Sequence, residues 1–293
     1  MLVVEGTSKT GIGKPLAAVL GAGFVEAGQR IFPDGESEIT IEDHEEGEDV
    51  VLVQTTYPFQ DKRLLELYLM AHEMKRRRVK SITAVVPYLA YARQDRHFEG
   101  KNNIVSISAV LEMLGSAGVG KLVTVAPHKK EPLAAFKGKV AVVDPIRDLA
   151  SGIKGDFKDP FILAPDKGAL DFAKAAAEVL ECDYAHIDKQ RDRHTGDISI
   201  VNAPKEGIDS KDVVVVDDMI STGGTIAQAA RFALSHGARN VAAAAVHLLM
   251  VDDAHEKMGA AGVSRLYGTN TVNFEKAKLV DISELIAQSV RRT

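Results

Sequence analysis

Short, β-branched hydrophobic runs alternate along the chain with longer stretches in which apolar residues recur at helical spacing. Several of the short runs are apolar throughout, as expected for strands covered on both faces. The alternation therefore predicts an α/β fold with mainly parallel sheets and right-handed crossovers. Strands are predicted at 50–54, 82–86, 122–126, 140–143, 161–164, 184–187, 198–201, 213–216 and 241–247. Helices are predicted around 61–76, 103–116, 167–180, 224–236 and 252–260.

The pattern also divides the chain. Segments 81–94 and 211–224 each place an apolar strand before a polar loop and then a helix, which indicates two similar halves. The 293 residues suit two domains. We place the domains at 1–143 and 144–280, and expect the amphipathic segment 281–293 to form a C-terminal helix that packs on the N-terminal domain. Residues 30–42 alternate apolar and polar positions, as in a hairpin or a sheet edge.

Composition narrows the functional classes. The formal net charge of -5 argues against non-specific nucleic-acid binding. The basic run 75–78 follows a helical pattern and is expected to be a solvated helix end rather than a nucleic-acid contact. The single cysteine, Cys182, excludes an internal disulfide and fits a reducing compartment. No signal peptide or membrane span is expected, so we predict a cytoplasmic protein.

The most informative stretch reads VVVVDDMISTGGT at 213–225. Ligands of open α/β sheets bind beyond the carboxyl ends of the strands, where this loop is expected. Its glycines let successive N–H groups point inward, its hydroxyls add donors, and the helix that follows adds positive potential. The loop is therefore predicted to bind an anion, most simply a phosphate monoester.

Two aspartates precede this loop, and they would repel a phosphate placed on top of them. Asp217 and Asp218 are better suited to accept hydrogen bonds from vicinal sugar hydroxyls beside a bound 5-phosphate. The alternative is that one of them caps a helix or closes a turn. A rival phosphate loop near Gly13 and Lys14 fails, because a P-loop would need glycine where Ser8 stands and Ser or Thr where Pro15 stands.

At this point the residues resemble a known family. VVVVDDMISTGGT is similar to the ribose-phosphate-binding signature of type I phosphoribosyltransferase-like proteins. Further segments, in order along the chain, narrow the resemblance to ribose-phosphate diphosphokinases, which make phosphoribosyl diphosphate (PRPP) from ATP and ribose 5-phosphate. These segments are FPDGE at 32–36, PYLAYARQD at 87–95, PH at 127–128, APDKG at 164–168 and DKQR at 188–191.

The resemblance implies two phosphoribosyltransferase-like domains of Rossmann-like, mainly parallel topology, with the ATP site on the first and the ribose 5-phosphate site on the second. It also implies Mg²⁺ as cofactor and a homo-oligomer, dimer or higher, in which a neighbouring subunit can share the adenine contacts. Implied ATP-binding residues are Phe32, Asp34, Gly35, Glu36, Arg93 and Gln94. Implied ribose-5-phosphate-binding residues are Asp217, Asp218, Ser221, Thr222, Gly223, Gly224 and Thr225. Implied metal contacts are His128 and Asp166, and implied catalytic cations are Lys189 and Arg191.

The residues are consistent with that chemistry, and some alternatives stay open. Diphosphoryl transfer needs cations near the β-phosphorus, and Lys189 and Arg191 are two donors in a polar loop, although the same loop suits an exposed hairpin tip. Arg93 could instead pair with Asp95. Asp166 could cap the helix after it. Mg²⁺ prefers oxygen ligands, so a contact with His128 is expected through water or with a softer metal such as Mn²⁺.

Two departures from the family pattern limit the resemblance. Many relatives carry an acidic residue at the position of Ser221, and a longer basic run at 96–99. Two other functions remain to be tested: a phosphoribosyltransferase that consumes PRPP and a base, and a regulatory protein that only binds phosphoribosyl ligands. The first leaves FPDGE and ARQD without a purpose, and the second should have lost its cations and metal contacts.

Overall fold

The computed structural model describes residues 1–42, 47–97, 102–191, 198–202 and 207–292, with backbone only for 189–191 and 198–202. The chain divides into two compact units, each discontinuous in sequence. Unit 1 comprises Met1–Asp144, Asn270–Val272 and Asp281–Thr293, and unit 2 comprises Pro145–Thr269 and Asn273–Val280. Each unit is built on its own six-stranded sheet.

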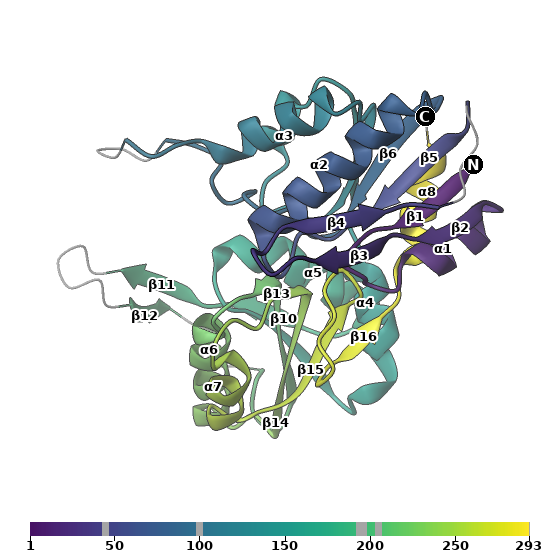
Figure 1. Ribbon diagram of the computed structural model, residues 1–293. Helices are drawn as coiled ribbons and strands as arrows, with labels where there is room; N and C mark the ends of the chain where they lie inside the picture. The colour runs from purple at the N-terminus through teal and green to yellow at the C-terminus, as the bar shows by residue number, and fades with distance from the viewer. Residues whose placement is uncertain (43–46, 98–101, 192–197, 203–206, 293) are drawn as a thin grey trace. The chain divides into compact units, whose positions relative to one another are not determined.

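The sheet of unit 1 is parallel throughout, with strand order β2-β1-β5-β6-β7-β8 (Figure 1). Its strands are β1 (Leu2–Glu5), β2 (Gly23–Glu26), β5 (Asp49–Val53), β6 (Ser81–Val86), β7 (Lys121–Val125) and β8 (Lys139–Val143). Its helices are α1 (Gly13–Leu20), α2 (Gln60–Arg76), α3 (Ser106–Ser116) and α8 (Ser283–Arg291), with a 3-10 turn η1 (Glu131–Ala135).

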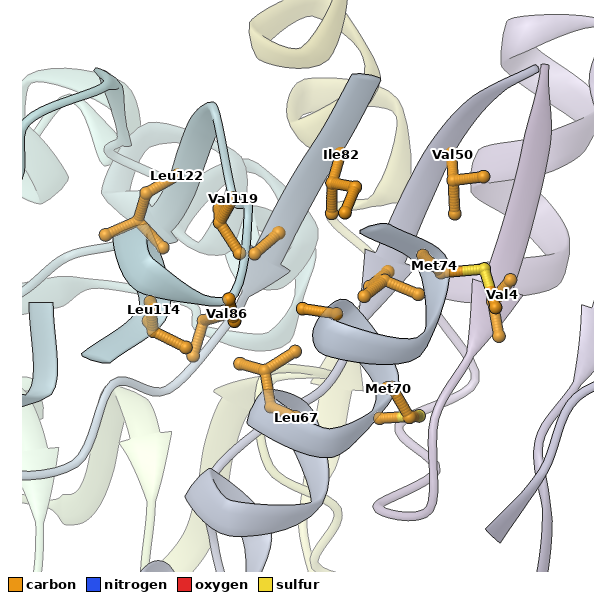
Figure 2. Packing of buried hydrophobic residues seen from close by; sticks show 14 of the residues in the cluster. Val4, Val50, Leu67, Met70, Met74, Ile82, Val86, Leu114, Val119 and Leu122 are labelled. Atoms are coloured by element: carbon orange, nitrogen blue, oxygen red, sulfur yellow. The ribbon is translucent and has the colours of Figure 1, made fainter. Parts of the chain in front are cut away.

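Helix α2 covers the middle of this sheet because its apolar residues recur every three or four positions. Leu67, Met70 and Met74 point at Val4, Val50, Ile82 and other strand residues (Figure 2). Burying each such side chain contributes about 1.5–3 kcal/mol. The helix ends inside the basic run 75–78, at Arg76, and Arg76 and Arg77 both donate to Glu73, so this run is a charged helix end as expected.

Helix α8 belongs to unit 1, where it lies against α1 (Figure 1). It also contacts β8, the last strand of that unit's sheet. Ile286, Ala287 and Val290 form its buried face. The amine of Lys121 donates to the carbonyl oxygen of Val290 at 2.9 Å, which satisfies one of the carbonyl groups left open at the helix end.

The sheet of unit 2 is also parallel, with strand order β10-β9-β13-β14-β15-β16. Its strands are β9 (Pro160–Ala164), β10 (Tyr184–His186), β13 (Asp212–Ile220), β14 (Asn240–Leu248), β15 (Val263–Thr269) and β16 (Lys278–Val280). Its helices are α4 (Ile146–Ile153), α5 (Leu170–Leu180), α6 (Gly224–Ser235) and α7 (Ala254–Ala260), with 3-10 turns η2 (Lys154–Asp156) and η3 (Lys167–Ala169).

Two hydrophobic cores sandwich this second sheet, which explains the uninterrupted valines of β13. Val213 and Val215 pack into a core with α6 and α7, whereas Val214 and Val216 pack into another with α4 and α5. Side chains alternate across a strand, so a strand covered on both faces has no polar side.

Two antiparallel hairpins lie outside the main sheets: β3 (Gly28–Ile31) with β4 (Ser37–Thr40), and β11 (Asp188–Arg191) with β12 (Ile198–Asn202). The first lies in the segment whose alternation predicts a hairpin. The predicted α/β class with parallel sheets is confirmed. Strands β1, β2, β11, β15 and β16 and helix α4 were not among the predicted elements, and Lys189 and Arg191, expected in a polar loop, lie on strand β11. In the part of the chain that the structure describes, no helix has the length and apolar character needed to span a bilayer.

Candidate active site

The aspartate doublet lies inside strand β13 and not after it. The prediction that the strand ends at Val216 is wrong, because the ladder to β14 continues through Asp217 opposite Ala245 to Ile220 opposite Leu248. The neighbouring strand β14 still offers backbone partners there, and pairing them avoids orphaned N–H and C=O groups. The doublet therefore has a strand's rigidity, while both side chains remain partly exposed at the carboxyl end of the sheet.

Three carboxylates converge at this edge. Asp166 follows β9, which pairs directly with β13, so it comes close to the doublet. Burial raises the pKa of Asp217 to about 8, and the negative charges of Asp218 and Asp166 add to the rise. Asp217 also accepts the backbone N–H of Asp218 at 2.9 Å. Such a cluster favours a cation or a group with several hydrogen-bond donors.

Asp166 also caps the turn that follows it, which is the structural role that the sequence left open. Its Oδ1 accepts the backbone N–H of Gly168 at 2.8 Å and so caps the 3-10 turn η3. The second carboxylate oxygen is not part of that cap, so the capping role is compatible with a ligand contact. By contrast, no side chain caps α6, so neither aspartate of the doublet serves as its N-cap.

The loop after the doublet is a tight turn onto the N-terminus of α6. Gly223 adopts φ 70°, and a Cβ there would lie 3.0 Å from the carbonyl oxygen of Ala254 and 3.0 Å from Met258 Cγ. At Gly224, the first residue of α6, a Cβ would meet nothing within 4 Å. The first turn of α6 thus presents backbone N–H groups, without a side-chain cap, beside open space.

Helix α7 and the segment just before it also hold this loop in place. The backbone N–H of Val251 donates to the carbonyl oxygen of Ser221 at 3.0 Å. Lys257 donates to the carbonyl oxygen of Thr222 at 3.2 Å and pairs with Asp253 at 3.0 Å. Sequence reasoning missed Lys257, because a contact across 35 positions leaves no local pattern. Ser221 and Thr225 are partly exposed and Thr222 is exposed, so these hydroxyls are accessible.

In unit 1, hydrogen bonds from other segments hold the stretch that follows β6. The hydroxyl of Thr56 donates to the carbonyl oxygen of Tyr88 at 2.6 Å and accepts the N–H of Ala90 at 2.7 Å. Tyr91, at φ 64°, donates its phenol to Asp61. This bracing fixes the backbone that leads into the predicted ATP contacts.

Arg93 and Gln94 lie exposed at the end of this segment. The alternative pairing of Arg93 with Asp95 is absent, because Arg96 occupies Asp95 through two bonds of 3.1 and 3.0 Å. No carboxylate of the described residues pairs with Arg93. Gln94 accepts the hydroxyl of Ser106 at 2.6 Å through its Oε1, which orients the amide.

The FPDGE segment forms the tip of the β3–β4 hairpin. The N–H of Phe32 donates to the carbonyl oxygen of Glu36 at 2.9 Å, and Asp34 accepts the N–H of Glu36 at 3.1 Å. Gly35 has φ 95°, a value that favours glycine. The guanidinium of Arg30 lies 5.0 Å from the centre of the Phe32 ring. Asp34, Gly35 and Glu36 are exposed.

His128 lies in unit 1, in the exposed segment that follows β7. In the described parts of both units, no three or more His, Cys, Asp or Glu side chains are arranged to hold a metal ion. Lys189 and Arg191 lie on β11, whose backbone pairs with β12 as Lys189 opposite Ile200 and Arg191 opposite Ile198. The segment 192–197 that follows them lies outside the described residues.

Comparison with known proteins decides the family. Residues 1–118 match the N-terminal domain of ribose phosphate pyrophosphokinase, and residues 135–275 match the phosphoribosyl transferase domain. A ribose-phosphate pyrophosphokinase of Saccharolobus solfataricus is 47% identical over 99% of this chain and 100% of its own length. One from Sulfolobus acidocaldarius is 42% identical over 99% and 100%.

The chain belongs to the ribose-phosphate pyrophosphokinase family. The resemblance carried by the five sequence segments is thereby confirmed, and so is the assignment to enzymes. A crystal structure of phosphoribosylpyrophosphate synthetase from Mycobacterium smegmatis matches 99% of this chain and 97% of its own, with a TM-score of 0.85 and 26% identity. That match supports the two-sheet α/β architecture of the family for this chain.

Proposed function

We propose that this chain synthesises PRPP from ATP and ribose 5-phosphate by transferring the β,γ-diphosphoryl group to the C1 hydroxyl and releasing AMP. The observation that carries the proposal is the joint arrangement on unit 2: a strand-borne aspartate doublet followed at once by an uncapped helix N-terminus beside open space. Acidic groups and anion-binding groups that lie side by side suit a ligand with a diol at one end and a phosphate at the other.

The ribose 5-phosphate contacts follow from this arrangement. The N–H groups of the first turn of α6, with the hydroxyls of Ser221, Thr222 and Thr225, take the 5-phosphate. Gly223 and Gly224 keep the backbone close to it. Asp217 and Asp218 accept hydrogen bonds from the ribose hydroxyls, and such bonds lower the pKa that burial and mutual repulsion raise in Asp217.

The ATP contacts are assigned to unit 1. The hairpin tip offers the ring of Phe32 and the polar groups of Asp34, Gly35 and Glu36 for the adenine end. Exposed Arg93 suits bidentate phosphate contact or stacking on adenine, and Gln94 lies beside it. In a homo-oligomer, dimer or higher, these contacts can serve a neighbouring subunit.

The family implies Mg²⁺, and the carboxylates at the edge of unit 2 offer oxygen atoms for it, although they do not form a complete metal site by themselves. A divalent cation would relieve the repulsion among Asp166, Asp217 and Asp218, whose oxygens are the ligands that Mg²⁺ prefers. Asp166 is assigned as a direct ligand of Mg²⁺. His128, on unit 1, is separately assigned a metal contact through water. When bound, the ion would neutralise charge on the phosphoryl oxygens.

The reaction needs little covalent chemistry from the protein. The C1 hydroxyl oxygen forms a bond to the β-phosphorus, the bond from that phosphorus to the oxygen bridging to the α-phosphate breaks, and AMP leaves with that oxygen while the hydroxyl proton is released. Positioning and charge neutralisation dominate such transfers. Lys189 and Arg191 are assigned to stabilise the transferred group. We further propose a cytoplasmic location.

The test uses the intact protein with Mg²⁺, ribose 5-phosphate and ATP labelled at the γ-phosphate. We expect AMP and PRPP to form one for one, with the label retained in PRPP. Release of the label as inorganic phosphate, with ADP as the other product, would refute diphosphoryl transfer. Diphosphate release from PRPP that depends on an added base would instead identify a phosphoribosyltransferase.

A further inference from the structure

Helix α2 carries a carboxylate that the proposed reaction does not use. Glu66 is only 1% exposed, although carboxylates are almost never fully buried unless they are paired. Burial raises the pKa of Glu66, but hydrogen bonds from Thr7, Ser37 and Arg63 outweigh it and leave the pKa below its ordinary value. The side chain is thus held as a buried anion.

The donors to Glu66 come from separate parts of unit 1. Oε1 accepts from Gln29 Nε2 at 2.5 Å and from Ser37 Oγ at 2.8 Å. Oε2 accepts from Arg63 at 2.8 Å and from the hydroxyl of Thr7. A fully bonded buried carboxylate is rigid, and the loss of a partner leaves a desolvated charge.

Two of these donors lie on the β3–β4 hairpin, one on each strand. Gln29 belongs to β3, and Ser37 is the first residue of β4, directly after Glu36 of the tip. All four residues of β3 are exposed, so apolar packing does little to hold that strand. Of the residues of β4, Ile39 packs against the core. One oxygen of Glu66 therefore bridges both strands just below the tip.

The other oxygen connects to the carboxyl end of the sheet. Thr7, which donates to Glu66, accepts the amide of Gln54 at 3.0 Å, and Gln54 is buried directly after β5. Gln54 in turn accepts the N–H of Ser8 at 3.1 Å. A continuous hydrogen-bond path thus runs from the hairpin through Glu66 to the edge of the sheet from which unit 1 presents its other ATP contacts.

We propose that Glu66 is a positioning residue for ATP, which sets the orientation of the β3–β4 hairpin relative to the sheet of unit 1. This inference rests on the proposed function, since it takes the hairpin tip as the adenine contact. Glu66 itself touches no substrate and acts through Ser37 and Gln29. A misplacement of about 1 Å in such a group can cost about 100-fold in rate.

The test compares Ser37→Ala with Ser81→Ala. Each removes one serine-to-carboxylate hydrogen bond in unit 1, but Ser81 bonds to Asp49 at 2.6 Å at the start of β6, away from the hairpin. The dissociation constant of ATP is measured by calorimetry, and KM for ATP and for ribose 5-phosphate by AMP formation. Glu66→Gln is the stronger variant, and its melting temperature is recorded, because it leaves Arg63 without its buried partner.

For Ser37→Ala we expect the dissociation constant and KM for ATP to rise by about 10–100-fold, the loss of one hydrogen bond to a charged group, with KM for ribose 5-phosphate unchanged. Ser81→Ala should change neither. Unchanged ATP affinity in Ser37→Ala, or equal losses for both substrates, would overturn the proposal. Calorimetry separates the two claims: if the wild-type chain binds ATP but forms no AMP, the proposed reaction fails while the role of Glu66 is still decided.

Discussion

Each unit has its own six-stranded parallel sheet covered by helices. The side chains at the carboxyl ends of the strands, however, differ in charge between the two sheets. At the edge of unit 2, Asp217 and Asp218 belong to strand β13, and Asp166 lies shortly after the neighbouring strand β9. The edge of unit 1 presents exposed Arg93 and His128 on loops, and its acidic hairpin tip stands on strands outside the main sheet. One scaffold thus supports two kinds of site, because function is carried by the segments at the strand ends.

The difference also lies in how rigidly each site is held. In unit 2 the doublet is fixed by parallel pairing and by valines buried on both faces. In unit 1 the corresponding segments depend on hydrogen bonds made by side chains, such as those from Thr56 to the backbone and from Ser37 to Glu66. We therefore expect unit 2 to set the fixed position of the sugar and unit 1 to adjust to the nucleotide.

The largest effect is expected at Lys189, which should govern turnover and not binding. Lys189→Ala should lower kcat by about 10³-fold or more, as the loss of a cation from a phosphoryl-transfer site does, while both substrates still bind. Lys211→Ala, which removes an exposed ion pair with Asp159, is the control and should leave turnover unchanged. Loss of substrate affinity that matched the loss of kcat would assign Lys189 to binding.

A reciprocal pair of variants tests the division of substrates between the units. Asp218→Asn should raise KM for ribose 5-phosphate by about 10–100-fold, since a hydrogen bond to a charged group is worth about 1.5–3 kcal/mol. Arg93→Ala should raise KM for ATP by a similar factor. Each variant should leave the other KM within about twofold. Initial-rate kinetics with each substrate varied would show a crossed result if the assignment were reversed.

A smaller effect distinguishes the two glycines of the loop that follows the aspartate doublet. Gly223→Ala should lower the free energy of unfolding by about 1–3 kcal/mol, because alanine is strained at φ 70° and its Cβ would crowd the carbonyl oxygen of Ala254. Gly224→Ala opens onto free space at the start of α6 and should not destabilise the fold, but it should weaken ribose 5-phosphate binding. Equal unfolding midpoints in urea would contradict the turn geometry.

The last expected effect is a pH dependence of stability within strand β13. Asp217 keeps its proton up to about pH 8 when folded but ionises near 3.8 when unfolded, so stability falls as pH rises between these values. Asp217→Asn should therefore raise the melting temperature at pH 8, without Mg²⁺ or substrate, and have little effect at pH 4.

Asp212, on the same strand, supplies the control of opposite sign. Its hydrogen bonds with Arg239 and Asn240 hold its pKa well below the ordinary value. Its contribution to stability is therefore present above about pH 4 and is lost as pH falls. Asp212→Asn should lower the melting temperature at pH 8. Shifts of the same sign in both variants would show that burial does not set the pKa of Asp217.

Much of unit 2's site could be predicted from local sequence. Four valines followed by two aspartates, Ser-Thr and two glycines specify a buried strand and a turn onto a helix, because each residue type restricts its own backbone and solvation. The end of the strand could not be read this way. It depends on how far β14 extends, and β14 begins some 20 residues beyond the aspartates.

The sequence by itself determined the α/β class, the family, and the buried strand and glycine turn that surround the aspartate doublet, since hydrophobic period and turn chemistry act over a few neighbouring positions. Only the tertiary structure decided that Asp166 raises the pKa of Asp217, that Arg96 rather than Arg93 pairs with Asp95, and that Glu66 joins both strands of the hairpin. These outcomes depend on hydrogen bonds, charges and packing, whose strength is set by distance in space and by burial. Neither the distance in space nor the burial can be read from the spacing of residues along the chain.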